Sequence, residues 1–229
     1  MVVDYARLQS FDEAWPPNDT EVSCLGTNLH QTTITNLRTG LNEAACAYQE
    51  PGQPLPWTAL SQTLLLGCRR PDGSYYRTYP DVFVYLAQVD PYRGSMTLDV
   101  DGPPALIIEL VSESSYETDI DLTRGKGYSY AHAGVLEYIA MDPTGEYLPR
   151  GVAAWRLADE SYAAWRPRED GRWYSEQAPV AFALEGAQAA VYLADGRRMP
   201  LEREIYGLVD ALARKDEEIA RLKRMLDGR

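Results

Sequence analysis

Glu109 is an unusual residue in this sequence because it lies inside the apolar run Ala105–Val111. A short and nearly continuous apolar run predicts a strand that is buried on both faces of a sheet. A carboxylate in such a strand costs several kcal/mol unless it is paired with a cation or binds a metal ion. We therefore expect Glu109 to have a partner, either an arginine beside it or a metal.

Asp81 raises the same question earlier in the chain. It follows Pro80 and begins the apolar run Val82-Phe83-Val84. Two interpretations are open: Asp81 is a turn residue after the proline, or it is a second acidic group beside Glu109.

Lys126 is the third residue of this kind. A helix over Thr118–Ala133 places Leu122, Lys126 and Tyr130 on one stripe, so the lysine either points at the sheet or extends past the helix edge to water. Nineteen of the 22 basic residues are arginines, and Lys126 is the only lysine before residue 200. This bias favours a specific need for a compact ammonium group.

Two carboxylates on adjacent strands with a facing lysine are typical of a hydrolase that uses a divalent metal. Oxygen ligands suit Mg²⁺ or Mn²⁺, which keep positions free for water and substrate phosphate. Asp81 and Glu109 are the candidate metal ligands, and Asp81, Glu109 and Lys126 are the candidate catalytic residues. Such a triple also arises by chance, so its spacing alone leaves the function open.

The elements that must position these residues follow from hydrophobic periodicity. Apolar residues at helical spacing predict a helix over Leu29–Tyr48, and His30 shares its buried face, where we interpret it as a packed core histidine rather than a ligand. Gln62–Cys68 and Tyr75–Ala87 flank Asp72-Gly73 and predict a hairpin. The strand Ala105–Val111, the helix and a buried strand over Leu136–Met141 form a βαβ-like unit.

The rest of the chain divides by composition. Residues 151–193 hold short aromatic-rich strands that predict an antiparallel extension of the sheet. The tail carries a heptad pattern, which predicts either a helix docked on the body or a free coiled coil. The expected organisation is an N-terminal arm (1–20), a core (21–150), a β-rich extension (151–200) and a C-terminal heptad helix (201–229). The heptad positions are Ile205, Leu208, Leu212, Lys215, Ile219, Leu222 and Leu226.

Composition excludes several classes of protein. A chain of 229 residues with 45% hydrophobic and 24% charged residues is globular, and no apolar run is long enough to span a membrane. Three dispersed cysteines and two histidines do not predict a zinc site or a disulfide scaffold. The net charge of −12 excludes non-specific coating of nucleic acid by a basic surface, but it leaves a local basic groove open. No signal peptide is visible, so we expect a cytoplasmic protein without a membrane partner.

The order Pro80-Asp81, then Glu109 within an apolar strand, resembles the PD-(D/E)XK nuclease superfamily. More closely, the segments PPALIIELVSESS and KGYSYAHAGVLEYIAMDP resemble a large bacterial family of restriction-endonuclease-like proteins. The resemblance covers about residues 20–145, and the helix near His30 takes part in it. The matching positions are Lys126, Tyr130, Gly134-Val135, Glu137-Tyr138 and Asp142-Pro143.

The sequence departs from the superfamily pattern at one position, because the lysine expected two residues after the glutamate is Val111. In the resembling family this lysine lies on the following helix, where Lys126 matches it. Glu21 is not carried over as a counterpart of the family's N-terminal acidic residue, because its spacing to His30 is short.

The resemblance implies an α/β (α+β) fold with a mixed sheet, namely a restriction-endonuclease-like core with the antiparallel extension and the C-terminal helix or coiled coil. It also implies an endonuclease that hydrolyses DNA with Mg²⁺ or Mn²⁺ held by Asp81 and Glu109. Arg69, Arg70, Arg77 and Arg124 are candidates for phosphate contacts or ordinary surface charges. The expected partners are DNA and a second copy in a homodimer. The alternative is a non-catalytic interaction protein that uses a nuclease-like fold and a coiled-coil tail.

Overall fold

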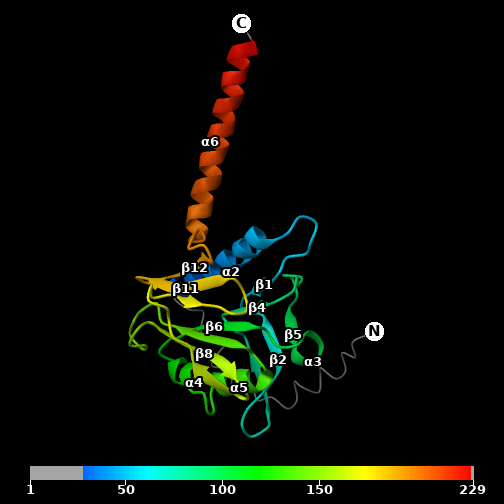
Figure 1. The fold of residues 1–229 in the computed structure, drawn as a ribbon, viewed down its shortest axis with the longest axis vertical. Helices are drawn as coiled ribbons and strands as arrows, with labels where there is room; N and C mark the ends of the chain where they lie inside the picture. Colours follow the sequence, from blue (N-terminus) through cyan, green and yellow to red (C-terminus); the bar gives the residue numbers. More distant parts are fainter. Residues whose placement is uncertain (1–27, 228–229) are drawn as a thin grey trace.

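The computed structural model describes residues 28–227 (Figure 1). The expected N-terminal arm over residues 1–20 and Glu21 lie outside the described residues. The fold is a mixed α/β structure with a mixed parallel and antiparallel sheet and a C-terminal helix, which is consistent with the expected restriction-endonuclease-like fold. The helices are α2 (Asn28–Tyr48), α3 (Leu98–Asp101), α4 (Tyr116–Ile120), α5 (Lys126–Ala133) and α6 (Glu202–Asp227).

A six-stranded sheet forms the centre of the fold, in the order β1-β4-β6-β7-β8-β9. β6 and β7 run parallel, and the other neighbours in this sheet are antiparallel. The parallel pair is joined through α4 and α5, so the expected βαβ unit is present. The six strands are β1 (Thr58–Leu60), β4 (Val82–Tyr85), β6 (Leu106–Leu110), β7 (Glu137–Met141), β8 (Val152–Ala158) and β9 (Ser161–Ala164).

Two smaller sheets accompany the central one, in the orders β3-β2-β5 and β10-β11-β12. The expected hairpin is the antiparallel pair β2–β3, whereas β2 and β5 are parallel. Its second arm, expected over Tyr75–Ala87, is divided: β3 pairs with β2, and after Pro80-Asp81 the chain enters the central sheet as β4. Only β8 and β9 extend the central sheet, because β10 to β12 pair with one another instead. The strands are β2 (Leu64–Arg69), β3 (Tyr75–Thr78), β5 (Ser95–Thr97), β10 (Trp173–Tyr174), β11 (Val180–Glu185) and β12 (Gln188–Leu193).

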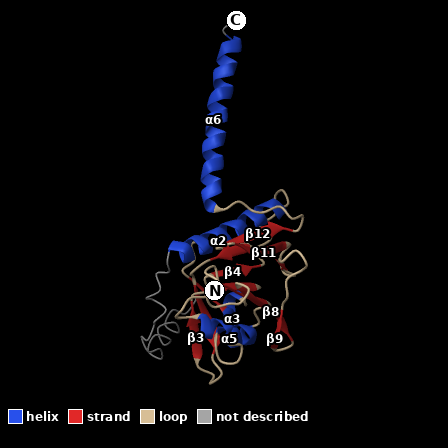
Figure 2. Ribbon diagram, turned by 90° about the vertical axis from the view of Figure 1, so that its left-hand side faces the viewer, coloured by secondary structure: helices blue, strands red, loops and turns tan. Residues whose placement is uncertain are grey.

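The middle strands of the central sheet, β4, β6 and β7, are buried on both faces, which is why β6 and β7 are nearly continuous apolar runs. One face packs against α2 and the sheet β10-β11-β12 (Figure 2). The other face packs against α4, α5 and residues of β2 and β3. Leu106, Ile108 and Leu110 of β6 belong to the first core and Ile107 to the second. The alternation of side chains along a strand therefore directs Glu109 toward α5.

The helix expected over Thr118–Ala133 is divided in two. α4 ends at Ile120 and α5 begins at Lys126, with Gly125 between them. A Cβ atom at Gly125 would lie 2.1 Å from the carbonyl oxygen of Thr118, so no other residue allows this close approach. Gly134 ends α5 in the left-handed conformation, with a φ of 85°. The tight turn fixes where the first residue of α5 enters the protein.

The last helix, α6, projects away from the body (Figures 1 and 2). Its first turn is anchored, because the N–H of Glu202 donates to Oδ1 of Asn36 on α2 and Arg198 pairs with Glu204. Within residues 28–227, no helix combines the length and the apolar character that crossing a membrane would need.

Candidate active site

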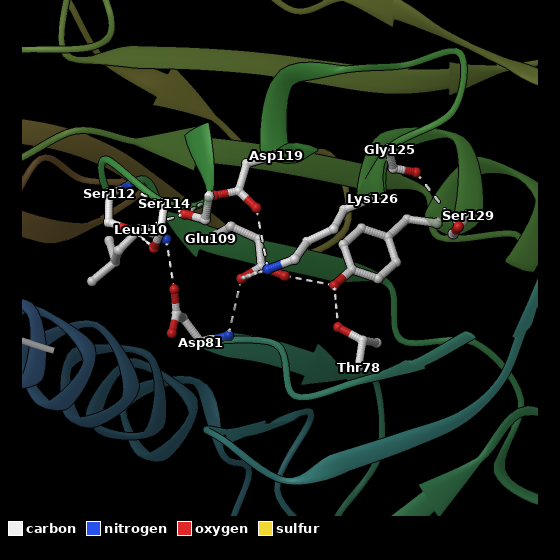
Figure 3. Close-up of polar contacts among 12 residues, drawn as sticks. Thr78, Asp81, Glu109, Leu110, Ser112, Ser114, Asp119, Gly125, Lys126 and Ser129 are labelled. Carbon is white, nitrogen blue, oxygen red and sulfur yellow. Dashed lines mark hydrogen bonds and ion pairs between the residues drawn. The ribbon is translucent and has the colours of Figure 1, made fainter. Parts of the chain in front are cut away.

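Asp81 and Glu109 lie opposite each other on the α5 side of the central sheet (Figure 3). The antiparallel register pairs Val82 with Ile108 at the end of the ladder, so Asp81 and Glu109 are the next facing positions beyond it. The backbone N–H of Asp81 lies 3.4 Å from Oε2 of Glu109, and Oδ2 of Asp81 accepts a hydrogen bond of 2.8 Å from the N–H of Leu110. The β4–β6 pairing therefore holds the two carboxylates together.

Lys126 completes the predicted triple from α5. Its ammonium lies 3.4 Å from Oε2 of Glu109, and the residue is only 8% exposed. The side chain therefore points at the sheet and does not extend to water. The structure thus brings together the three residues that the sequence singled out, Asp81, Glu109 and Lys126 (Figure 3).

Asp119 on α4 is a further member of the cluster that sequence reasoning missed. Its Oδ1 lies 3.1 Å from the ammonium of Lys126, and its Oδ2 accepts a hydrogen bond from the Ser115 hydroxyl at 2.7 Å. The signal was present, because Asp119 lies two helical turns before Lys126, on the stripe that contains Leu122. Lys126 is thus held between two buried carboxylates, those of Glu109 and Asp119.

Tyr130 supports Glu109 from the next turn of α5. Its hydroxyl donates a hydrogen bond of 2.5 Å to Oε1 of Glu109 and lies 2.9 Å from Oγ1 of Thr78. A hydrogen bond to a carboxylate is stronger than one between neutral groups, so it fixes the rotamer of Glu109. Burial raises the pKa of Tyr130 well above its usual value, so the phenol stays protonated as a donor.

His30 does not have the environment that its sequence pattern predicted. Its Nε2 lies 3.2 Å from Oδ1 of Asp81, and its side chain is partly exposed, so the interpretation as a packed core histidine is wrong. His30 is in the first turn of α2, where its imidazole contacts the carboxylate of Asp81. Asp81 is the more open of the two facing carboxylates, with a side-chain exposure of 14% against 1% for Glu109.

The charges of the cluster do not balance. The cluster holds three carboxylates, those of Asp81, Glu109 and Asp119, and one ammonium group, which contacts Glu109 and Asp119. This leaves an excess of two negative charges if all the carboxyl groups are ionised. Burial raises the pKa of Glu109 to about 8, against the opposing attraction of Lys126, and repulsion from Asp81 adds to the rise. Burial also raises the pKa of Asp119. Both shifts favour the protonated, neutral form of these two carboxyl groups, which reduces the excess of negative charge.

The donor set fits a divalent cation that is bound only in part by protein. Within residues 28–227, no three His, Cys, Asp or Glu side chains lie close enough to hold a metal by themselves. Mg²⁺ and Mn²⁺ do not need such a cage, because one or two carboxylates with waters and substrate phosphates satisfy them. Asp81 and Glu109 supply two carboxylates, and the excess of negative charge matches a divalent cation.

The four arginines considered for phosphate contacts lie in different local settings. Arg69 and Arg70 stack over Tyr75 and Tyr76 in the β2–β3 hairpin. Nε of Arg124 lies 4.0 Å from Oδ2 of Asp121 in the turn before α5. Arg77 lies on β3, two residues after Tyr75. The structure thus places Arg69 and Arg70 around the hairpin turn and Arg124 beside the turn that leads to Lys126.

Comparison with known proteins agrees with this geometry. The model of the Uma2 family, described as "Putative restriction endonuclease", matches residues 20–190. No curated protein matches the chain. The match covers most of the chain, including all the residues of the cluster, so the chain belongs to the Uma2 family.

Proposed function

We propose that this member of the Uma2 family is a metal-dependent endonuclease that hydrolyses phosphodiester bonds in DNA. The observation that carries the proposal is the convergence of Asp81 and Glu109 on facing strand positions, with the ammonium of Lys126 3.4 Å from Glu109. Family membership supports a nuclease, and the donor set supports its dependence on a metal.

Asp81 and Glu109 are the residues that would hold Mg²⁺ or Mn²⁺. When bound, the cation lowers the pKa of a water molecule and offsets the negative charge of the scissile phosphate. The hydrogen bonds from Leu110 and Tyr130 each occupy one oxygen of Asp81 and Glu109, respectively. These bonds orient both carboxylates before substrate arrives, which lowers the reorganisation that the reaction needs.

Lys126 contributes positive charge beside the reacting phosphate. Hydrolysis adds water across one P–O bond, and negative charge grows on the phosphoryl oxygens as that bond breaks. An ammonium held between Glu109 and Asp119 is preorganised to stabilise this charge or to orient the attacking water. Asp119 would then act as a positioning residue, because its carboxylate is buried and contacts the ammonium of Lys126.

His30 would position Asp81 in the same way. The imidazole contacts Oδ1 of Asp81, while the backbone N–H of Leu110 occupies Oδ2. The side of the cluster formed by Asp81 and His30 is more exposed than the rest, since Glu109 and Asp119 are both buried. We infer that the phosphate approaches from the side of Asp81 and His30.

A non-catalytic interaction protein is the second candidate function. The net charge of −12 favours it, because DNA must approach against repulsion that salt screens only in part. The exposed apolar side chains of α6 also favour a role in binding. A nuclease assay separates the two functions.

The test is cleavage of plasmid and single-stranded DNA with Mg²⁺, with Mn²⁺ and with EDTA. We expect the wild type to cut with metal and to be inactive with EDTA. Asp81→Ala should abolish cleavage, whereas Asp99→Ala, which removes an exposed carboxylate outside the cluster, should not. Equal cleavage by the wild type and Asp81→Ala, or no cleavage by the wild type under any condition, would overturn the proposal.

A further inference from the structure

The helix α6 is long and exposed over most of its length. Its 26 residues span about 39 Å at the usual rise of an α-helix. Its described contacts with the body lie at its start, where Glu202, Arg203 and Glu204 bond to Asn36, Gln188 and Arg198. Beyond that start the helix extends away from both cores (Figure 1). Its stability therefore has to come from something other than the body.

An apolar seam runs along the projecting part. The residues Leu208, Leu212 and Ile219 are 56%, 61% and 50% exposed, and with Ile205 they lie at alternating spacings of three and four, with Lys215 between Leu212 and Ile219. This heptad pattern is the signature of a coiled coil rather than of a helix that covers a globular core. In proteins most of the stability of a helix comes from packing of its apolar face, so an exposed seam of this kind calls for a partner.

We propose that the partner is a second copy of this chain and that the two α6 helices form a parallel coiled coil in register. In heptad notation Ile205, Leu212 and Ile219 occupy a positions, and Leu208 and Lys215 occupy d positions. In a parallel pair, identical a residues face each other, as do identical d residues. The leucine and isoleucine side chains that are now exposed would be buried in these layers.

The charges beside the seam select this partner and this orientation. Glu218 is at a g position and Lys223 at the following e position, so each glutamate faces the lysine of the second copy in a parallel pair. Lys215 interrupts the apolar seam, and Asp216 at the adjacent e position offers it a carboxylate from the second copy. Residues 201–229 hold seven acidic and seven basic side chains, so the tail carries no net charge while the remainder of the chain carries the whole excess of −12. Two copies of the tail therefore meet without net repulsion.

The geometry has a consequence for the whole assembly. A parallel coiled coil begins at the same end in both chains, so it holds the two bodies side by side at that end. Each body would bring its own copy of the Asp81–Glu109 cluster. The coiled coil itself does not depend on the proposed nuclease activity and can be tested without it.

The first test is the mass of the full-length protein in solution by light scattering over a range of concentrations. We expect twice the chain mass of 25.7 kDa for the wild type, and a monomer for the double variant Leu212→Glu/Ile219→Glu. Glu217→Gln, on the opposite face of the helix, is the matched control and should stay dimeric. A wild type that is monomeric throughout, or a seam variant that remains a dimer, would overturn the proposal.

The second test fixes the orientation. In the parallel pair, Glu218 of each copy faces Lys223 of the other, so Glu218→Lys or Lys223→Glu turns two attractive pairs into repulsive ones. Each variant should raise the Kd of the dimer by about tenfold or less. The charge-swapped double variant should recover wild-type affinity only in the parallel arrangement. Leu208→Cys should also form a disulfide-linked dimer on oxidation, while Glu217→Cys should form none beyond the wild-type background. No recovery in the double variant together with no crosslink at residue 208 would exclude the parallel pair.

Discussion

At the scale of single residues, the Lys126 ammonium lies between the carboxylates of Glu109 and Asp119, and this explains the choice of lysine there. The space between two buried carboxylates on neighbouring elements suits a compact cation on a flexible stem. The planar guanidinium of arginine would present a wider fork to the same two groups. Lysine therefore serves both the local charge balance and the proposed reaction.

Replacing Lys126 tests both roles. Lys126→Met leaves Glu109 and Asp119 buried without their cation, which typically lowers the free energy of unfolding by about 3–5 kcal/mol. The loss should be smaller at acid pH, where the two carboxylates bind protons. Lys126→Arg keeps the charge and should retain more of the stability, yet both variants should lose cleavage. Urea unfolding and the plasmid assay measure the two effects separately. Full activity of Lys126→Arg would show that only positive charge matters at this position.

The titration of Glu109 predicts a pH dependence of stability. Burial raises the pKa of Glu109 from 4.5 in the unfolded chain to about 8 in the folded protein. The folded state then binds the proton more tightly than the unfolded chain does. The contribution of Glu109 to the free energy of unfolding is therefore complete when the pH is below the pKa of the unfolded chain, and it is lost as the pH rises through the pKa of the folded protein. In EDTA the melting temperature should therefore fall between about pH 5 and pH 8.

Glu109→Gln is the matched variant for this effect, because it cannot titrate at that position. Its melting temperature should change less over the same pH range. The change that remains includes the titration of Asp119, because burial also raises the pKa of that carboxyl group. Calorimetric scans of both proteins in EDTA provide the comparison. Parallel curves for the two proteins would contradict the assignment of the slope to Glu109.

At the scale of elements, the long periodic patterns were predictable and the breaks between them were not. The helix α2, the hairpin β2–β3 and the buried pair β6–β7 follow from apolar spacing, because packing agrees with local preference there. Glu109 also indicated the site from the sequence alone, because a carboxylate within an apolar, buried strand stands out against its neighbours.

The division between α4 and α5 was not predictable from periodicity. The stripe from Leu122 to Tyr130 continues through the turn, so spacing alone indicates one helix. The break depends on the contact of Gly125 with the Thr118 carbonyl, which exists only in the folded structure. The environment of His30 is not predictable from spacing for a similar reason, because it depends on where the start of α2 lies relative to Asp81.

Gly125 therefore offers a test at the scale of elements. Gly125→Ala would place a methyl group 2.1 Å from the Thr118 carbonyl oxygen and force α4 and α5 apart. We expect a loss of stability of about 1–3 kcal/mol and weaker cleavage, because the next residue is Lys126. Gly94→Ala, where no atom lies within 4 Å, is the control and should change little. Equal urea midpoints for both variants would show that the turn relaxes without cost.

At the scale of the whole molecule, the central sheet separates two cores and places the candidate site on one of its faces. The core under α2 is apolar and supports β6 from behind, while the face toward α5 carries Glu109 and Lys126. The opposite face also carries a buried carboxylate, Glu137, which pairs with Arg156 at 3.0 Å, so the sheet keeps the candidate site apart from this second ion pair. The opposite core supplies the apolar burial that stabilises the fold.

The central claim is that Asp81 and Glu109 together hold a divalent cation, and thermal melts with EDTA and with millimolar Mn²⁺ test it most directly. A ligand at about 100 times its Kd adds about 2.7 kcal/mol to the folded state, which raises the Tm of a protein of this size by about 5–10 °C. Wild type and the exposed-site control Glu160→Gln should show this rise, and Glu109→Gln should not. A wild type that does not respond to Mn²⁺, or a Glu109→Gln protein that responds equally, would contradict the claim.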